Sequence, residues 1–106
     1  MNIKLTDIFK KDFKKLVKRD KFLIEKFEAL LNQLQINPTA GTSLGNGKYK
    51  IRIQNKSNNK GKSAGYRVIT YTKLDDVILL VYIYSKSDLE NISSSKIDEI
   101  IINYPL

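Results

Sequence analysis

Hydrophobic residues are spaced in two ways along this chain, and the change of spacing separates a helical first third from a β-rich remainder. Over residues 7–36, apolar side chains recur every three or four positions opposite a lysine-rich face, as in amphipathic helices. A break near Arg19–Asp20 divides this stretch in two. Asn37–Pro38 ends it, because the residue before a proline is disfavoured in helices. We therefore predict an αα-hairpin over residues 7–36, with Thr6 or Asp7 capping its first helix.

Strand patterns precede and follow this hairpin. Residues Asn2–Thr6 alternate between polar and apolar side chains, as a short strand does. After a glycine-rich link, Lys48–Asn55 alternates strictly, with polar and basic residues on one face and apolar residues on the other. Gly65–Leu74 is rich in β-branched and aromatic residues, and Val77–Tyr84 is apolar on both faces, which indicates a central or covered strand. Because the last three strands follow one another closely, we predict an antiparallel meander.

The final segment predicts a third helix. Its apolar residues have helical spacing: Ile97, Ile100, Ile101 and Tyr104. Ser95 and Asp98 are placed as a capping box for this helix. The chain has no internal repeat, and its 106 residues suit a single domain. The predicted fold is a small α+β domain over residues 1–106 with the order β-αα-βββ-α, in which an antiparallel sheet packs against the αα-hairpin and a C-terminal helix follows.

Charge is distributed unevenly over these elements. The chain has 19 Lys and Arg against 11 Asp and Glu, a net charge of +8. Between Ala29 and Leu74 no residue is acidic. The same stretch holds eight basic residues: Lys48, Lys50, Arg52, Lys56, Lys60, Lys62, Arg67 and Lys73. Charge of one sign on a sheet suits a polyanion, so RNA or DNA is the expected partner.

Three of these cations share one face of a single predicted strand. Lys48, Lys50 and Arg52 are alternate residues, so their side chains lie about 6–7 Å apart, close to the spacing of successive phosphates. We predict a face that follows a nucleic acid backbone, against the alternative of a solvated face that happens to be lysine-rich. The remaining lysines of the stretch would add non-specific phosphate contacts: Lys56, Lys60, Lys62 and Lys73.

The chain contains neither cysteine nor histidine. This excludes disulfides, thiolate nucleophiles and imidazole catalysis, and it removes the preferred ligands of transition metals. We therefore predict no cofactor and no metal site; an enzyme of this composition must use Lys, Arg, Tyr, Ser or carboxylates. Tyr84, at the end of the last predicted strand, could stack on a base or share in proton transfer. No signal peptide or membrane-spanning run is apparent, so we expect a cytoplasmic protein.

Several of these segments together resemble a known family. GYRVITY, preceded by YKIRI and followed by VYIYSKSDLENIS, is similar to motifs of the RelE/ParE superfamily of bacterial toxin–antitoxin toxins. The connection GKSAG is most like the HigB-type, RelE-like branch. The resemblance covers nearly the whole chain and implies the same element order. It implies a metal-independent endoribonuclease that enters the ribosomal decoding site and cleaves the bound mRNA, and that a cognate antitoxin neutralises in a hetero-oligomer.

The resemblance also implies a catalytic set, in which the ribose 2′-OH of the substrate is the nucleophile. Matched by position, the basic residues of this set are Lys50, Arg52, Arg67 and Lys86. Arg52 and Arg67 would bind the scissile phosphate as its charge builds. Lys50 or Lys86 would serve as general acid or base.

The chain departs from the family pattern at two positions. Ser87 stands where RelE-type enzymes have an Arg, and Ser93 stands roughly where they have a Tyr. Tyr84 is therefore our candidate to replace the family tyrosine. Two alternative functions remain at this point: a ParE-like inhibitor of DNA gyrase, and a non-enzymatic module that binds nucleic acid.

Overall fold

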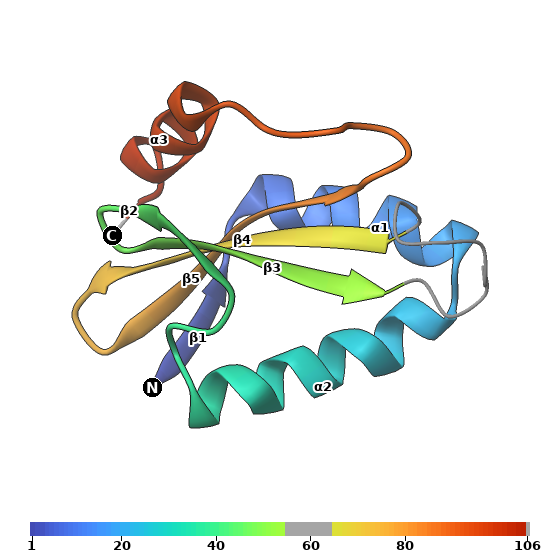
Figure 1. The fold of residues 1–106 in the computed structure, drawn as a ribbon, viewed down its shortest axis with the longest axis horizontal. Helices are drawn as coiled ribbons and strands as arrows, with labels where there is room; N and C mark the ends of the chain where they lie inside the picture. Colours follow the sequence, from blue (N-terminus) through green and yellow to red (C-terminus); the bar gives the residue numbers. More distant parts are fainter. Residues whose placement is uncertain (55–64, 106) are drawn as a thin grey trace.

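A five-stranded sheet lies at the centre of the computed structural model, which describes residues 1–54 and 65–105 (Figure 1). The strands are β1 (Asn2–Leu5), β2 (Thr42–Gly45), β3 (Lys48–Gln54), β4 (Gly65–Leu74) and β5 (Val77–Ser85). The helices are α1 (Asp7–Arg19), α2 (Phe22–Ile36) and α3 (Ser94–Ile102). This is the predicted α+β order with one added strand. The whole predicted connection after β3 (residues 55–63), with Lys56, Lys60 and Lys62, lies outside the described residues.

The strands are arranged in the order β1-β5-β4-β3-β2. β3, β4 and β5 form the predicted antiparallel meander. Two features differ from the prediction of a purely antiparallel sheet. β1 pairs with β5 in parallel, which makes the sheet mixed and is possible because the αα-hairpin supplies the long crossover that parallel pairing needs. β2 pairs with β3 in the segment that we predicted to be only a turn-rich link.

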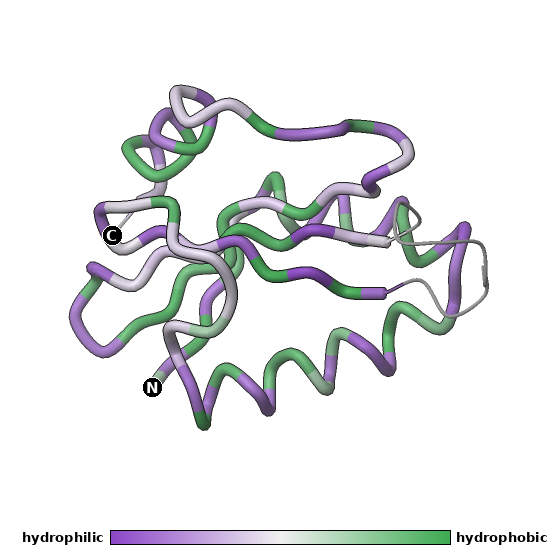
Figure 2. The backbone as a smooth tube through the Cα atoms, in the orientation of Figure 1, coloured by the Kyte–Doolittle hydropathy of each residue, from purple (hydrophilic) through white to green (hydrophobic). Residues whose placement is uncertain are grey.

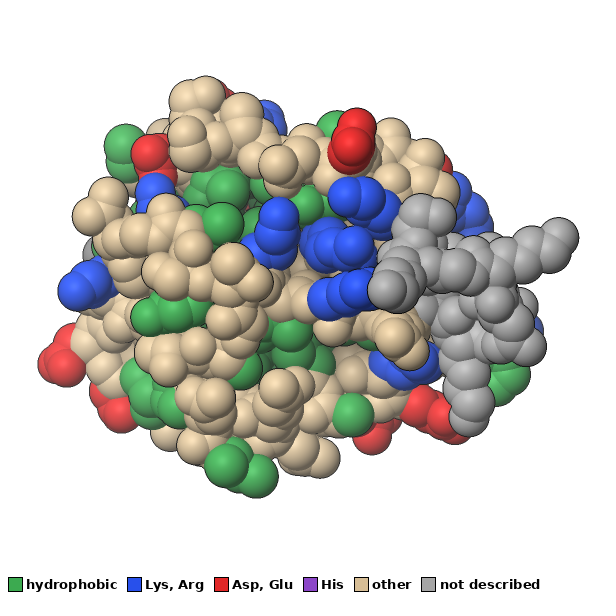
Figure 3. All heavy atoms as spheres, in the orientation of Figure 1, with side chains coloured by type: hydrophobic (Ala, Val, Ile, Leu, Met, Phe, Trp, Pro, Cys, Tyr) green, Lys and Arg blue, Asp and Glu red, His purple; other side chains and the backbone are tan. Residues whose placement is uncertain are grey.

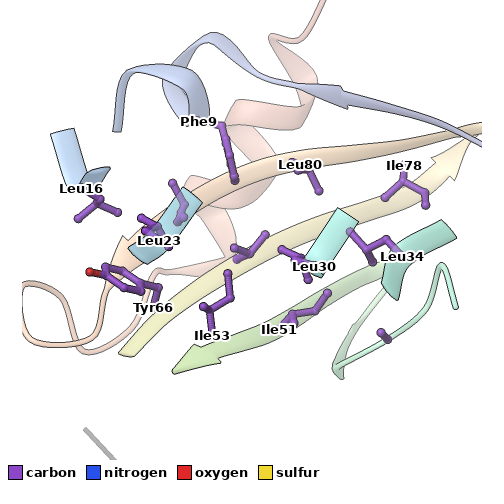
Figure 4. Close-up of a cluster of buried hydrophobic side chains, with 13 residues drawn as sticks. Phe9, Leu16, Leu23, Leu30, Leu34, Ile51, Ile53, Tyr66, Ile78 and Leu80 are labelled. Atoms are coloured by element: carbon purple, nitrogen blue, oxygen red, sulfur yellow. The ribbon is translucent and has the colours of Figure 1, made fainter. Parts of the chain in front are cut away.

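The αα-hairpin covers one face of the sheet. Figure 4 shows side chains of α1 and α2, among them Phe9, Leu30 and Leu34, directed toward Ile51 and Leu80 of the sheet, and all five are buried. Figure 2 shows hydrophilic and hydrophobic residues alternating along β3 and along α2, so each element has one apolar face to bury. The buried side chains between the two helices and this face of the sheet form the main hydrophobic core.

The start of α1 is fixed to the sheet by its capping residue. The hydroxyl oxygen of Thr6 accepts a hydrogen bond from the backbone N of Phe9 at 3.0 Å, which confirms one of the two predicted caps. The same hydroxyl donates to the backbone oxygen of Val81 in β5 at 2.8 Å. One buried side chain therefore satisfies a free N–H of the helix end and a strand carbonyl together.

α3 lies on the opposite face of the sheet and covers only part of it. Ile97 of α3 is buried against Ile69, Leu79 and Val81, which form a second, smaller core. Our prediction of Ser95 as the helix cap was wrong: Ser93 precedes the helix, and its hydroxyl accepts from the backbone N of Lys96 at 3.2 Å. No helix among the described residues has the length and apolar character needed to cross a membrane.

Candidate nucleic-acid interface

We call the sheet face opposite α1 and α2 the open face. Three candidate residues form a row across one end of it, because the strand register pairs Arg52 of β3 with Arg67 of β4, and Arg67 with Tyr84 of β5. Paired residues project to the same side with Cβ atoms about 5 Å apart. The side chains of two arginines and a tyrosine therefore leave the sheet next to one another. We refer to these three residues as the arginine row.

Lys50 lies one step along the same face. It pairs with Ile69 and is half-buried, about 6–7 Å from the arginine row by strand rise. Figure 3 shows Lys and Arg side chains gathered over β3, β4 and the segment after β5 on this side of the molecule. The basic surface predicted from the strand pattern is thus present at the end of the open face that carries the arginine row.

Lys86 reaches the same region from the turn after β5. Its backbone N donates to the carbonyl oxygen of Gly65 at 2.8 Å, which places Lys86 beside the first residue of β4. The turn is held by the carbonyl oxygen of Ser85, which accepts from the backbone N of both Asp88 and Leu89 at 3.0 Å. The structure therefore brings the five predicted catalytic residues to one end of the sheet.

The guanidinium of Arg67 folds back along its own strand. Its Nη1 donates to the backbone oxygen of Tyr66 at 3.3 Å. A Cβ at Gly65 would lie 3.4 Å from the same nitrogen and 2.7 Å from the backbone oxygen of Ile53. Glycine is therefore needed at the start of β4, since any other residue would crowd both the neighbouring strand and Arg67.

Tyr84 is buried next to Arg67, and only 5% of its surface is exposed. Burial raises the pKa of its phenol, and the nearby charge of Arg67 opposes this shift. Its hydroxyl makes no hydrogen bond within the part of the chain that the structure describes. An unsatisfied buried hydroxyl costs about 1–3 kcal/mol. The neutral phenol therefore keeps an unused hydrogen-bond donor next to Arg67.

The two predicted RNA-binding lysines that the structure describes lie elsewhere. Lys48 was predicted to share an exposed face with Arg52, but it is only 7% exposed and its Nζ lies 2.6 Å from Oδ1 of Asp98 on α3. The reason is that α3 covers this end of the open face and brings a carboxylate with it. Lys73 is exposed near the opposite end of β4, where its side chain packs over Gly47.

A pocket of about 340 Å³ lies between Lys50 and the start of α3. Ser93 lines this pocket and caps α3, so a hydroxymethyl group lies where the resemblance implies a phenol. Among the described residues no group of three metal-ligating side chains lies together. Sequence reasoning missed two parts of the site, Gly65 at the start of β4 and Asn91, which lines this pocket. The glycine of the GYR motif was the available signal for the first, whereas nothing in the sequence pattern indicated the second.

Comparison with known families agrees with this architecture. The family described as the RelE toxin of the RelE/RelB toxin–antitoxin system matches residues 3–102. No curated protein matches the sequence significantly. The matched region runs from β1 to the end of α3 and contains the arginine row, Lys50 and Lys86. The HigB-type branch stays a prediction. This chain belongs to the RelE toxin family, and its role is that of a toxin paired with an antitoxin.

Proposed function

We propose that this toxin is an endoribonuclease that cuts mRNA in the ribosomal decoding site. The observation that supports it best is the register that places Arg52, Arg67 and Tyr84 side by side. Two arginines in one row can each bind a phosphate group bidentately, with two N–H donors on two of its oxygens. Their charge is fixed before the substrate arrives, which is the arrangement that stabilises charge developing in a transition state.

The proposed reaction is a transesterification within the bound RNA strand. The ribose 2′-oxygen attacks the adjacent phosphorus, the bond to the 5′-oxygen breaks, and the products carry a 2′,3′-cyclic phosphate and a 5′-hydroxyl. One proton leaves the 2′-hydroxyl and one is delivered to the 5′-oxygen. Arg52 and Arg67 stabilise the added negative charge on the phosphate oxygens.

The two lysines lie on either side of Arg67. Lys50 pairs with Ile69, two residues after Arg67, and the backbone of Lys86 is bonded to Gly65, two residues before it. In-line displacement needs a base and an acid on opposite sides of the phosphorus. This flanking arrangement supports Lys50 and Lys86 as the acid–base pair. Because the arginine row supplies the positive charge, we propose that the chemical step needs no metal ion held by the toxin.

Primer extension on a reporter mRNA, in a reconstituted translation reaction with and without ribosomes, tests the proposal. We expect cuts inside codons only when ribosomes translate. Arg67→Ala should lower the cleavage rate by about 10²–10³-fold. Lys14→Ala, which removes the same charge from the exposed side of α1, should cleave like the wild type. Intact mRNA under both conditions would overturn the proposal, and accumulation of DNA breaks in cells would instead favour a gyrase inhibitor.

A further inference from the structure

A buried carboxylate lies on the helix side of the sheet, across from the arginine row. Asp20, the residue that ends α1, is 5% exposed. Its Oδ1 accepts from the backbone N of Phe22 at 3.1 Å, and its Oδ2 accepts from the hydroxyl of Tyr66 at 2.9 Å. A buried carboxylate is costly unless it is hydrogen-bonded, and here both oxygens have donors. The side chain of Asp20 is thus fixed between the two helices and β4.

Tyr66 connects this carboxylate to the open face. Figure 4 shows Tyr66 on the helix side of the sheet, near Leu16 and Leu23. Its phenol donates to Asp20, while its backbone oxygen accepts from Nη1 of Arg67. The side chain of Tyr66 is therefore fixed on the helix side, while its backbone carbonyl accepts the hydrogen bond that orients Arg67.

We propose that Asp20 is a positioning residue for Arg67 and acts through Tyr66. The inference rests on the proposed function, because it explains how Arg67 is oriented to bind the scissile phosphate. Arginine has many rotamers, and electrostatic stabilisation requires its guanidinium within about 0.5 Å of the productive place. The bond from Asp20 holds the side chain of Tyr66 near the start of β4, and with it the backbone carbonyl that the guanidinium contacts.

A double-mutant cycle separates positioning from general stability. Tyr66→Phe removes only the hydroxyl and keeps the buried ring. We expect its kcat for ribosome-dependent cleavage to fall on the order of 10-fold with KM within about twofold, because misplacement of a catalytic group affects the chemical step. In an Arg67→Ala background the same change should have no further effect on kcat. If the role of Tyr66 were only structural, Tyr66→Phe would instead lower kcat by the same factor in both backgrounds.

Asp20→Asn tests the other end of the contact. The amide keeps one acceptor oxygen for two donors, so we expect a smaller loss of kcat than in Tyr66→Phe. Glu28→Gln, which removes the same charge from the exposed side of α2, is the matched control. Leu34→Val, in the core at the other end of α2, controls for lost stability. Should Tyr66→Phe not fold, Asp20→Asn in the two backgrounds carries the test.

The outcomes for this inference and for the proposed function are distinct. A wild type that cuts no mRNA would overturn the proposed function and this inference with it. A wild type that cuts, an Arg67→Ala variant that is impaired, and both Tyr66→Phe and Asp20→Asn at wild-type rates would overturn the positioning role alone. Losses of kcat matched by Leu34→Val at equal loss of melting temperature would also overturn it.

Discussion

Lys48 and Arg52 lie on the same strand and face the same side of the sheet, yet the structure uses them differently. Lys48 is 7% exposed, lies beneath α3 and is paired with Asp98. Arg52 is exposed and stands in the arginine row beside Arg67. Strand alternation thus determines which face a cation occupies, whereas the element that covers that face determines whether its side chain is buried or exposed.

Removing each cation in turn is the sharpest test of this contrast. Arg52→Gln should lower mRNA cleavage on the order of 100-fold and leave the free energy of unfolding within about 0.5 kcal/mol of the wild type. Lys48→Gln removes the same charge and should do the reverse, with near-normal cleavage and a lower free energy of unfolding. Primer extension and urea denaturation measure the two effects. Equal losses of cleavage in both variants would contradict the distinction.

Tyr66 is a second buried polar side chain, like Lys48, but it lies on the helix side of the sheet. Burial, and then its hydrogen bond to Asp20, raise the pKa of Tyr66 to about 12. The pKa of an unfolded tyrosine is about 10. The folded state therefore keeps the proton longer, and the stability from this group is full below pH about 10 and is lost as pH rises to about 12.

We expect this loss to amount to roughly 2–3 kcal/mol, at about 1.4 kcal/mol for each pKa unit. Tyr66→Phe cannot release the proton, so its free energy of unfolding should fall less steeply over the same interval. Urea denaturation of both proteins from pH 9 to 12 measures the difference between the curves. Parallel curves would show that the phenol is not held as the structure indicates.

For the ion pair of Lys48 with Asp98, removing the carboxylate alone should cost more stability than removing both charges. Asp98→Asn leaves a buried ammonium without its carboxylate and should cost about 1–2 kcal/mol. Adding Lys48→Met to this variant removes the unpaired charge but keeps the aliphatic stem, so most of the lost stability should return. Glu99→Gln, at an exposed neighbouring position on α3, is the control in urea denaturation. A cost for Asp98→Asn no greater than for Glu99→Gln would argue against the buried pair.

The smallest effect concerns the cap of the helix that covers Lys48. Ser93→Ala should lower the free energy of unfolding by about 0.5–1 kcal/mol, because the hydroxyl that accepts from Lys96 is lost. Ser95→Ala, inside the first turn of α3, should be neutral or slightly stabilising since alanine is the better helix former. Thermal unfolding of the two variants ranks them, and the opposite ranking would restore Ser95 as the cap.

Local patterns were sufficient to predict most of the elements. The helical spacing of α1 and α2, the alternation in β3 and the β-branched residues of β4 each describe a property that a segment has by itself. β2 escaped prediction because Thr42–Gly45 contains a single apolar residue beside two polar residues and one glycine. The parallel pairing of β1 with β5 depends on contacts across most of the chain, which periodicity does not record.

The candidate site was predictable by face but not by register. Alternation placed Arg52 on one face of β3, and the resemblance selected Arg67, but neither states that the two residues are direct partners across the strands. The register that pairs them depends on the length of the segment between β3 and β4, whose sequence has no hydrophobic periodicity. The contact of Lys48 with Asp98 joins residues 50 positions apart, so no local pattern indicated that this lysine is covered.

The parallel placement of β1 also affects the order in which the protein assembles. β3, β4 and β5 are consecutive hairpins, whereas the bond from Thr6 to Val81 closes a separation of 75 residues. Long-range closure costs more chain entropy, so we expect β1 to join the sheet after the folding transition state. Leu5→Ala should then speed unfolding and leave the folding rate nearly unchanged, a φ-value near zero in stopped-flow measurements. The strands that carry the arginine row would therefore pair first, and one edge of β5 would stay unpaired until β1 joins it.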